Sequence, residues 1–421
     1  MNTTLQLSGA FPADSRLIGA RLEIGGCDAV ELAREYGTPA YVVAEADLVD
    51  RARQFLAAAE ECGGDVQVAF ASKAFPCTAA MAIFAREGLW CDVASEGELH
   101  LALAAGFPAE RIVLHGNAKS AAELERALIE RVGLIVVDNE DELDLLERLA
   151  AGSGQQVLVR VTPDVRGETH EKISTGQADS KFGMGPRQAA AALARIERSD
   201  SLEAAGVHVH IGSQLFDLEP LRLAARALEP FAGLAVWDLG GGLAVKYNAA
   251  GASPPSIDDY VKAVVGAARE AGHPQHSRLI LEPGRALVAN AGVTLYSVQS
   301  IKRNVSTWVA VDGGMSDNLR PMLYGARYEA HIADRMSGEG ELCVVAGKHC
   351  ESGDVIVPEA LLDAPRRGDV IVTPATGAYG YAMTNNYNGV PRAPVIFCAD
   401  GQSRVVVRRE SLDELMARDV G

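Results

Sequence analysis

A lysine and a Glu-Pro-Gly-Arg sequence, far apart in the chain, are the residues best suited to do chemistry. Lys73 ends an apolar run at 68–73, and Glu282 and Arg285 close a second apolar run. A lysine directed into the mouth of a barrel can form a Schiff base with a carbonyl compound. A buried carboxylate and a nearby arginine suit a pyridine ring and a carboxylate substrate. On strand parity, residues 69, 71 and 73 share one face, which leaves room for a cofactor above two alanines.

The composition limits the class of protein. The chain has 421 residues, 48% hydrophobic and 23% charged, which is enough for two globular domains. Its 56 acidic against 39 basic side chains disfavour binding to nucleic acid or an anionic membrane through bulk charge. We expect no membrane span and no secretory leader, because no apolar run approaches ~18 residues. Seven cysteines without a Cys-x-x-Cys pair suit reduced thiols, so we expect a cytoplasmic protein.

Short apolar runs alternate with longer amphipathic stretches from about residue 47 to residue 285. Eight strands alternating with helices predict a (β/α)8 barrel over residues 46–285. A doubly wound open sheet is the alternative, but no Gly-x-Gly-x-x-Gly turn follows the first strand. The predicted strands are 66–71, 90–94, 112–115, 134–137, 156–161, 205–211, 236–239 and 278–282, and helical periodicity is clear at 96–105, 121–130 and 141–150.

The remaining sequence predicts a β-rich second domain. From about residue 291, strand-like runs are separated by Gly, Pro and Asp rather than by long helices. We expect these strands at 307–311, 341–345, 369–373, 395–398 and 403–408. Residues 1–45, with an apolar run at 40–43, are expected to pack with residues 286–421. A long polar stretch at 163–185 interrupts the barrel pattern and is typical of a functional or disordered loop.

Charged or imidazole side chains end seven of the eight predicted barrel strands, and three glycines end the other. A barrel of this kind builds its active site at these strand ends. The residues are Lys73, Asp92, His115, Asp138, Arg160, His208, His210, Gly240, Gly241, Gly242, Glu282 and Arg285. His208 and His210 lie two apart and would share a face of the strand. A metal site would lack a third ligand at suitable spacing, so a flat imidazole stacked on an aromatic cofactor fits better. Ser213 and the three glycines could contact a phosphate, although triple glycine is more often a tight turn.

Three later segments are also dense in functional groups. Arg320 and Tyr324 lie four apart, Cys350 precedes Glu351, and Tyr379 lies between glycines. Each has an ordinary structural explanation as a turn, a free buried cysteine or a surface tyrosine. For the cysteine alone that explanation is preferred, because most free cysteines are structural.

Taken in order, these motifs resemble the pyridoxal-phosphate-dependent decarboxylases of the alanine-racemase fold (fold type III), and within that family its diaminopimelate-decarboxylating branch. The similarity extends from about Gly37 to Arg392 and rests on the order and spacing of all the motifs together. The motifs are Ala71-Ser72-Lys73-Ala74, Asp92-Val93-Ala94-Ser95-Glu96-Gly97-Glu98, Ile173-Ser174-Thr175-Gly176, Lys181-Phe182-Gly183, His208-Val209-His210-Ile211-Gly212-Ser213-Gln214, Gly240-Gly241-Gly242, Glu282-Pro283-Gly284-Arg285, Arg320-Pro321-Met322-Leu323-Tyr324, Cys350-Glu351-Ser352-Gly353-Asp354 and Gly377-Ala378-Tyr379-Gly380.

The resemblance implies pyridoxal 5'-phosphate as cofactor and a role for each matched residue. Lys73 would carry the cofactor as a Schiff base, Glu282 would pair with the pyridine nitrogen, and His210 would stack on the ring. Asp92 and Arg160 would support the cofactor. Its phosphate would be held by Ser213, Gly240, Gly241, Gly242, Gly284, Arg285 and Tyr379. The substrate would be bound by Arg285, Arg320, Tyr324, Glu351 and Tyr379, and Cys350 would act as the acid.

The implied reaction is loss of the D-centre carboxylate of meso-2,6-diaminopimelate, which gives L-lysine and carbon dioxide as the last step of lysine biosynthesis. A bidentate arginine suits the distal carboxylate of this substrate, and Glu351 suits its distal amine. The family also implies a homodimer with shared active sites, in which Cys350 and Glu351 reach the partner's pocket. Residues 1–45 and 286–421 would then complete the active site and the dimer interface, and the 173–183 loop would lie near that site.

Three alternatives stay open. A decarboxylase of ornithine, arginine or lysine would keep the cofactor site but has no distal carboxylate to hold. A catalytically dead binding protein would be expected to have lost Lys73 or Cys350. A metal-dependent barrel hydrolase would use His208 and His210. The chain departs from the family pattern at Lys348 and His349, which either activate the Cys350 thiol or are simple surface residues.

Overall fold

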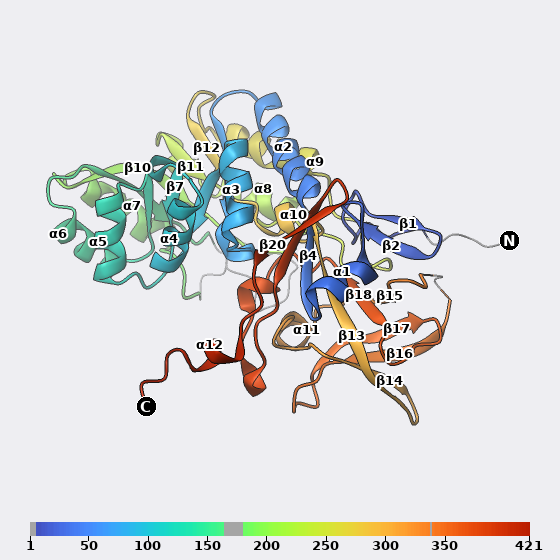
Figure 1. Cartoon of the computed structure of the whole chain (residues 1–421). Coiled ribbons are helices and arrows are strands. Elements are labelled where there is room, and N and C mark those ends of the chain that lie inside the picture. The colour runs from blue at the N-terminus through green and yellow to red at the C-terminus, as the bar shows by residue number, and fades with distance from the viewer. Residues whose placement is uncertain (1–5, 164–179, 337–338) are drawn as a thin grey trace. The chain divides into compact units, whose positions relative to one another are not determined.

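The computed structural model describes residues 6–163, 180–336 and 339–421 and divides the chain into two compact units (Figure 1). The barrel unit contains Val49–Ala244 and Ser253–Ala286. The β unit contains Met1–Leu48, Val245–Ala252 and Leu287–Gly421. Most of the predicted loop at 163–185, with its motif at 173–176, lies outside the described residues.

The barrel unit is a closed parallel barrel of eight strands, which confirms the predicted fold class. Every neighbouring pair is parallel, and the last strand pairs with the first. The strands are β5 (Val66–Ala71), β6 (Trp90–Val93), β7 (Ile112–Leu114), β8 (Leu134–Val137), β9 (Gln155–Arg160), β10 (Leu202–His208), β11 (Val236–Asp238) and β12 (Arg278–Leu281). Because all eight run the same way, the residues that follow them meet at one rim.

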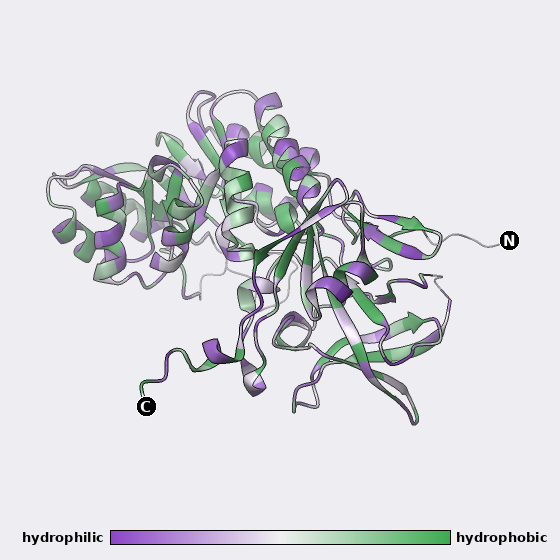
Figure 2. Cartoon of the chain, in the orientation of Figure 1, coloured by the Kyte–Doolittle hydropathy of each residue, from purple (hydrophilic) through white to green (hydrophobic). Residues whose placement is uncertain are grey.

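Helices cover the outside of this barrel, as the amphipathic stretches predict. Several begin at a polar cap: the Ser95, Ser120 and Asn139 side chains each accept a hydrogen bond from a first-turn N–H. The strands are largely hydrophobic, whereas the helices carry mixed faces (Figure 2). The helices are α2 (Glu45–Glu61), α3 (Thr78–Glu87), α4 (Glu96–Ala104), α5 (Ala121–Glu130), α6 (Glu140–Leu149), α7 (Pro186–Ile196), α8 (Glu219–Arg226) and α9 (Ile257–Glu270).

One apolar cluster takes a side chain from every barrel strand. It consists of Ala69, Trp90, Val113, Leu134, Val136, Leu158, Ala205, Val236 and Ile280, all buried. This packed core holds the strands rigidly, so the polar residues just past their carboxyl ends are fixed relative to one another.

The β unit is built on a nine-stranded sheet with its own two apolar cores. All the predicted strands form, and the N-terminal strand β4 (Ala40–Ala44) pairs with β13 (Gly292–Arg303) and β19 (Val395–Ala399), as expected. Two long strands were not predicted, β13 and β17 (Val355–Leu362), and neither were the short strands at 16–18, 21–24, 27–28 and 331–332. The remaining strands are β1 (Arg16–Ile18), β2 (Arg21–Ile24), β3 (Cys27–Asp28), β14 (Thr307–Val311), β15 (His331–Ile332), β16 (Glu341–Ala346), β18 (Val370–Pro374) and β20 (Gln402–Val407).

Short helices complete the chain: α1 (Ala29–Tyr36), α10 (Arg285–Val288), α11 (Arg320–Tyr324) and α12 (Leu412–Met416). Among the helices of the described ranges, none is both long and apolar enough to cross a membrane.

Candidate active site

Lys73 lies just beyond β5, in a short 3-10 helix (Ser72–Ala74), whereas the parity argument placed it at the end of a strand over 68–73. The parity argument therefore fails for it, because the two-residue period of the strand ends at Ala71. Its Nζ atom lies 2.9 Å from Oδ2 of Asp92, which β6 positions. The Lys73 side chain is 44% exposed, whereas that of Asp92 is 1% exposed. A buried carboxylate thus orients an amine that a small molecule can reach.

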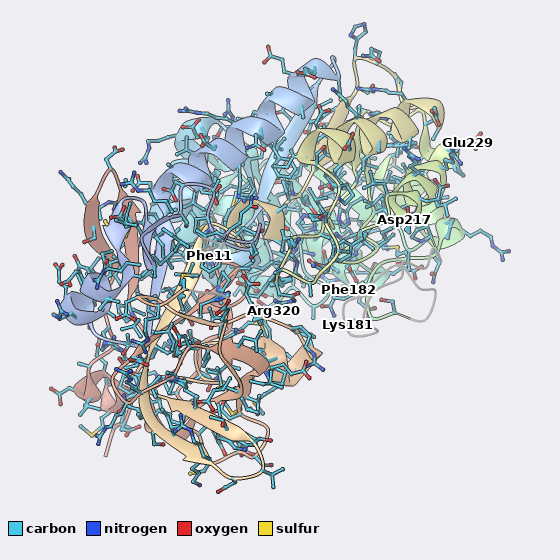
Figure 3. The ribbon with its side chains drawn as sticks, turned by 90° about the vertical axis from the view of Figure 1, so that its right-hand side faces the viewer. Phe11, Lys181, Phe182, Asp217, Glu229 and Arg320 are labelled. Atoms are coloured by element: carbon cyan, nitrogen blue, oxygen red, sulfur yellow. The ribbon has the colours of Figure 1, made fainter. Side chains whose placement is uncertain are left out.

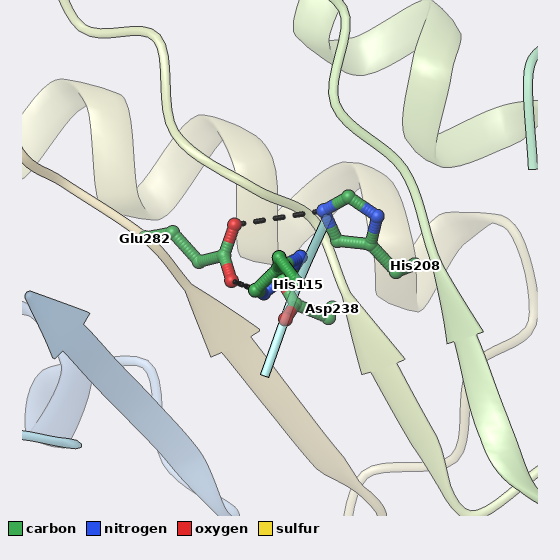
Figure 4. Close-up of side chains that lie close together, drawn as sticks. All are labelled: His115, His208, Asp238 and Glu282. Carbon is green, nitrogen blue, oxygen red and sulfur yellow. Dashed lines mark ion pairs between the residues drawn. The ribbon is translucent and has the colours of Figure 1, made fainter. Parts of the chain in front are cut away.

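Glu282 follows β12 and lies among four buried ionisable side chains (Figure 4). Its Oε1 atom is 2.6 Å from Nε2 of His115, and its Oε2 atom is 3.5 Å from Nε2 of His208. The two imidazole rings meet edge to face, with centroids 4.8 Å apart. Asp238, the last residue of β11, completes the group: one ligand-type atom from each of the four lies within 4.8 Å of the others.

The charges in this cluster are unequal. Burial alone would raise the pKa of Glu282, but His115 and His208 hold that pKa well below its ordinary value, so the carboxylate is ionised. Burial and the neighbouring Glu282 raise the pKa of Asp238 well above its ordinary value. Burial lowers the pKa of His208 to about 3, so this imidazole is neutral. The cluster therefore concentrates one negative charge on Glu282.

Two chemistries are compatible with these four side chains alone. Imidazole and carboxylate groups are common metal ligands. A buried carboxylate held in its ionised form suits equally a protonated ring nitrogen. The histidine pair predicted from the sequence does not form, because His210 does not belong to the cluster.

His210 lies beyond the end of β10, so the prediction that it shares a strand face with His208 was wrong. The N–H of Gly241 donates to its Nδ1 atom at 3.2 Å, which leaves Nε2 to carry the proton of a neutral ring. Burial first, and then the charges of Lys73 and Arg160, lower the pKa of His210 well below its ordinary value. A neutral, oriented ring of this kind suits stacking on an aromatic ligand.

The three glycines differ in what they offer. The Gly240 N–H donates to Asp238 Oδ1 at 3.0 Å, and that of Gly241 is bound to His210. A Cβ atom would lie 2.2 Å from the Glu282 carbonyl oxygen if Gly241 carried one. Gly240 and Gly241 thus allow close packing and have committed their N–H groups, which leaves Gly242 as the phosphate candidate.

Arg285 and Ser213 meet beside the lysine segment. The buried Arg285 donates from Nη2 to Ser213 Oγ at 2.8 Å and from Nε at 3.3 Å. At Gly284 a Cβ atom would lie 3.0 Å from Cβ of Ala71, so this loop packs closely at the end of β5. A guanidinium and a hydroxyl held together suit a phosphate.

Arg160, the last residue of β9, contacts Phe182 of the predicted motif at 181–183. Its Nη1 atom is 3.6 Å from Asp138 Oδ1, and its guanidinium carbon lies 4.3 Å from the ring centroid of Phe182, which Figure 3 labels. Asp138 Oδ2 accepts a hydrogen bond from the Gly183 N–H at 3.1 Å. Burial lowers the pKa of Arg160, while Asp138 and Glu282 oppose that effect.

In the β unit, Arg320 is a buried cation among tyrosines (Figure 3). Its Nη1 atom donates to the Tyr328 hydroxyl at 2.5 Å. Its guanidinium carbon lies 4.7 Å from the ring centroid of Tyr247 and 6.0 Å from that of Tyr324. Burial lowers the pKa of Arg320, but the tyrosines outweigh it and the pKa is raised. No carboxylate of the described chain forms an ion pair with Arg320, so it suits a ligand carboxylate.

The other predicted residues of the β unit lie in loops. Cys350 and Glu351 are exposed between β16 and β17. The Cys350 N–H donates to Asn388 Oδ1 at 3.0 Å, and Glu351 accepts a hydrogen bond from the Tyr387 hydroxyl. Tyr379 follows β18 in a left-handed conformation, with φ of 58°.

Comparison with known proteins separates the two chemistries. The family model for the pyridoxal-dependent decarboxylase, pyridoxal binding domain, matches residues 46–289. The chain belongs to the pyridoxal-dependent decarboxylases. Diaminopimelate decarboxylase of Bacillus subtilis (strain 168) is 44% identical over 420 residues, 95% of each chain. That of Mycobacterium tuberculosis (strain ATCC 25618 / H37Rv) is 41% identical over 94% of each. The M. jannaschii diaminopimelate decarboxylase in complex with L-lysine aligns with a TM-score of 0.92 and 33% identity over 99% of both chains.

Pyridoxal phosphate is the cofactor of these decarboxylases, and the residues of the barrel unit fit it. The accessible Lys73 amine suits its aldehyde, and the ionised, buried Glu282 suits its protonated ring nitrogen. The Arg285–Ser213 pair suits its phosphate. A metal-dependent hydrolase is set aside, since it gives no role to this lysine.

The structure places four side chains that had no predicted role beside predicted residues: two beside Glu282 in the barrel unit and two beside Arg320 in the β unit. His115 was noted at a strand end without a role, and Asp238 was not noted. The available signal for Asp238 was its place two residues before Gly240, near the end of a predicted strand. Tyr247 and Tyr328 had no signal, because only folding brings them around Arg320.

Proposed function

We propose that this decarboxylase converts meso-2,6-diaminopimelate to L-lysine and carbon dioxide, the last step of lysine biosynthesis. The observation that carries the proposal is its 44% identity with the B. subtilis diaminopimelate decarboxylase over 95% of each chain. Pyridoxal phosphate, when bound, supplies an electron sink for the electron pair left by the departing carbon dioxide. The chain's own residues orient the reactants around it.

In the barrel unit, Lys73 holds the cofactor covalently and Asp92 orients its amine. Glu282 faces the ring nitrogen and keeps it protonated, and this preorganised charge stabilises the electron-rich state. His210 stacks on the ring, and Arg160 supports it. Ser213, Gly242, Gly284 and Arg285 bind the phosphate, with Tyr379 as a further contact and Gly240 and Gly241 as packing residues.

In the β unit, Arg320 binds the distal carboxylate of the substrate and Tyr324 lies beside it. Arg320 is suited to this role because it is charged, buried and surrounded by hydroxyl-bearing rings. Glu351 binds the distal amine, and Cys350 donates the proton that replaces the lost carboxylate. Ornithine, lysine and arginine lack the distal carboxylate, which favours diaminopimelate over them.

The substrate is tested by comparing turnover of meso-diaminopimelate with that of ornithine, lysine and arginine at equal concentration. We expect turnover of meso-diaminopimelate alone. Faster release of carbon dioxide from any of the other three would assign the enzyme to that amino acid. Borohydride reduction of the holoenzyme followed by peptide mass spectrometry should place the cofactor on Lys73; label on another lysine would contradict the site.

We further propose a cytoplasmic homodimer whose subunits share active sites. Lys73→Ala and Cys350→Ala proteins, each inactive alone, should regain activity when mixed, because one site of a mixed dimer is then whole. Each variant mixed with itself is the control. No recovery, after subunit exchange has been demonstrated with labelled chains, would contradict shared sites.

A further inference from the structure

The loop that carries Cys350 and Glu351 is closed by a contact between two buried residues. Residues 350–353 are exposed, whereas His349 and Asp354 on either side are buried. The Nδ1 atom of His349 lies 2.7 Å from Oδ2 of Asp354, and it is the donor because a carboxylate only accepts. His349 is therefore not the surface residue that the sequence allowed.

The Asp354 carboxylate accepts three hydrogen bonds. Oδ2 accepts the His349 backbone N–H at 3.0 Å in addition to the imidazole. Oδ1 accepts the Met315 backbone N–H at 2.8 Å. Met315 belongs to the segment that leads into α11 and Arg320. One side chain thus joins the Cys350 loop to the Arg320 segment within the β unit.

Neighbouring glycines make room for this carboxylate. A Cβ atom at Gly347 would lie 2.1 Å from Asp354 Oδ2, and one at Gly314 would lie 2.4 Å from the same oxygen. The site accommodates a carboxylate only because both residues lack a side chain. Such close fit, with three donors aimed at two oxygens, is typical of a residue that fixes a loop in one conformation.

The other side of the loop is held by the segment at 385–388. The Cys350 N–H donates to Asn388 Oδ1 at 3.0 Å. The Tyr387 ring stacks on His349 at a centroid distance of 6.0 Å, and its hydroxyl binds Glu351. Cys350 is therefore fixed to Asn388 through its backbone and follows the buried His349 directly. Glu351 is connected to His349 through the Tyr387 ring.

We infer that Asp354, acting with His349, is a positioning residue that holds the Cys350 thiol and the Glu351 carboxylate in their working geometry. The inference rests on the proposed roles of Cys350 and Glu351. An aspartate is needed because both of its oxygens accept hydrogen bonds, and in either orientation an amide would direct its NH2 group at one or more of these donors. Displacement of a catalytic group by about 1 Å can cost ~100-fold in rate, so the loop conformation matters for turnover.

The test is the Asp354→Asn holoenzyme, with Glu359→Gln, an exposed carboxylate on β17, as matched control. We expect kcat to fall about 10- to 100-fold in Asp354→Asn and to stay within about twofold in the control. Affinity for pyridoxal phosphate should be unchanged in both. Hydrogen exchange of the amides of residues 347–355 should accelerate in Asp354→Asn only.

A double-mutant cycle separates positioning from general damage. If Asp354 acts through Cys350 and Glu351, Asp354→Asn should lower kcat less than about threefold in a background that carries Cys350→Ser and Glu351→Gln. A full, additive loss in that background, or unchanged exchange in 347–355, would overturn the inference. Absence of meso-diaminopimelate turnover in the unsubstituted enzyme would instead refute the proposed function, and the exchange measurement would still test the loop.

Discussion

Replacement of His115 by phenylalanine tests how the buried Glu282 is kept ionised. Phenylalanine retains a flat ring against His208 but removes the nitrogen that lies 2.6 Å from Glu282 Oε1. The carboxylate then loses the neighbour that lowers its pKa most in this buried site. We expect the pKa of Glu282 to rise, because burial, which His115 had offset, now dominates.

The size of the effect follows from the contact that is lost. A hydrogen bond to a charged group contributes about 1.5–3 kcal/mol. If Glu282 holds the protonated ring nitrogen, the Kd for pyridoxal phosphate should rise about 10- to 150-fold. The loss of affinity for pyridoxal phosphate should be largest at low pH, where the raised pKa leaves Glu282 protonated. It should become smaller as pH rises and the carboxylate ionises again.

The assay is titration of the apo-protein with pyridoxal phosphate, followed by visible absorbance, from pH 6 to pH 9. His100→Phe, an exposed histidine on α4, is the matched control and should leave Kd unchanged. A His115→Phe protein that binds the cofactor within about twofold of the unsubstituted protein at every pH would refute the reasoning. So would a loss that grows as pH rises.

Further substitutions test other parts of the account. Arg320→Leu should reduce kcat/KM for meso-diaminopimelate by about 100-fold, since it removes a charge-assisted contact of ~3 kcal/mol, and should leave cofactor absorbance intact; unchanged kinetics would exclude it from substrate binding. Burial raises the pKa of Asp317 to about 7. The pKa of Asp317 is therefore higher in the folded than in the unfolded protein. Its stabilising contribution to the free energy of unfolding is complete below about pH 4 and is lost as pH rises towards 7. Asp317→Asn should therefore stabilise the protein at pH 8 by on the order of 2 kcal/mol and have less effect at pH 5, as judged by urea unfolding; equal effects at both pH values would contradict this. A Cβ atom at Gly206 would lie 1.7 Å from the Val236 carbonyl oxygen, so Gly206→Ala should destabilise by several kcal/mol, whereas Gly266→Ala on α9, with nothing within 4 Å, should stabilise by about 0.5–1 kcal/mol.

The barrel could be predicted because its strands are short apolar runs between amphipathic helices. Strands of the β unit were predicted where an apolar run was long enough and free of proline, and were missed where the run was very short, ended in polar residues or contained proline. The end of β13, at 299–303, is largely polar and exposed, and β17 contains Pro358, which argues against a strand. β5 ends where the predicted strand 66–71 ends, so the parity argument could not extend to Lys73. β10 ends at His208, before the predicted end at residue 211, and so excludes His210.

Candidate site residues could be chosen from the sequence, but their contacts could not be predicted. Lys73 and Glu282 were recognisable from type and position. The contact of His115 with Glu282, and the tyrosines around Arg320, depend on barrel closure and on packing within the β unit. Neither leaves a periodic signal in the sequence. The same holds for Asp354 and His349, whose neighbours on either side are exposed.

The most direct test is release of carbon dioxide from meso-diaminopimelate by the purified holoenzyme, with L-lysine measured as the second product and Lys73→Ala run in parallel. We expect carbon dioxide and L-lysine in equal amounts from the unsubstituted enzyme and neither from Lys73→Ala. Lysine formation that persists in Lys73→Ala, or no turnover by protein that carries bound cofactor, would contradict the account.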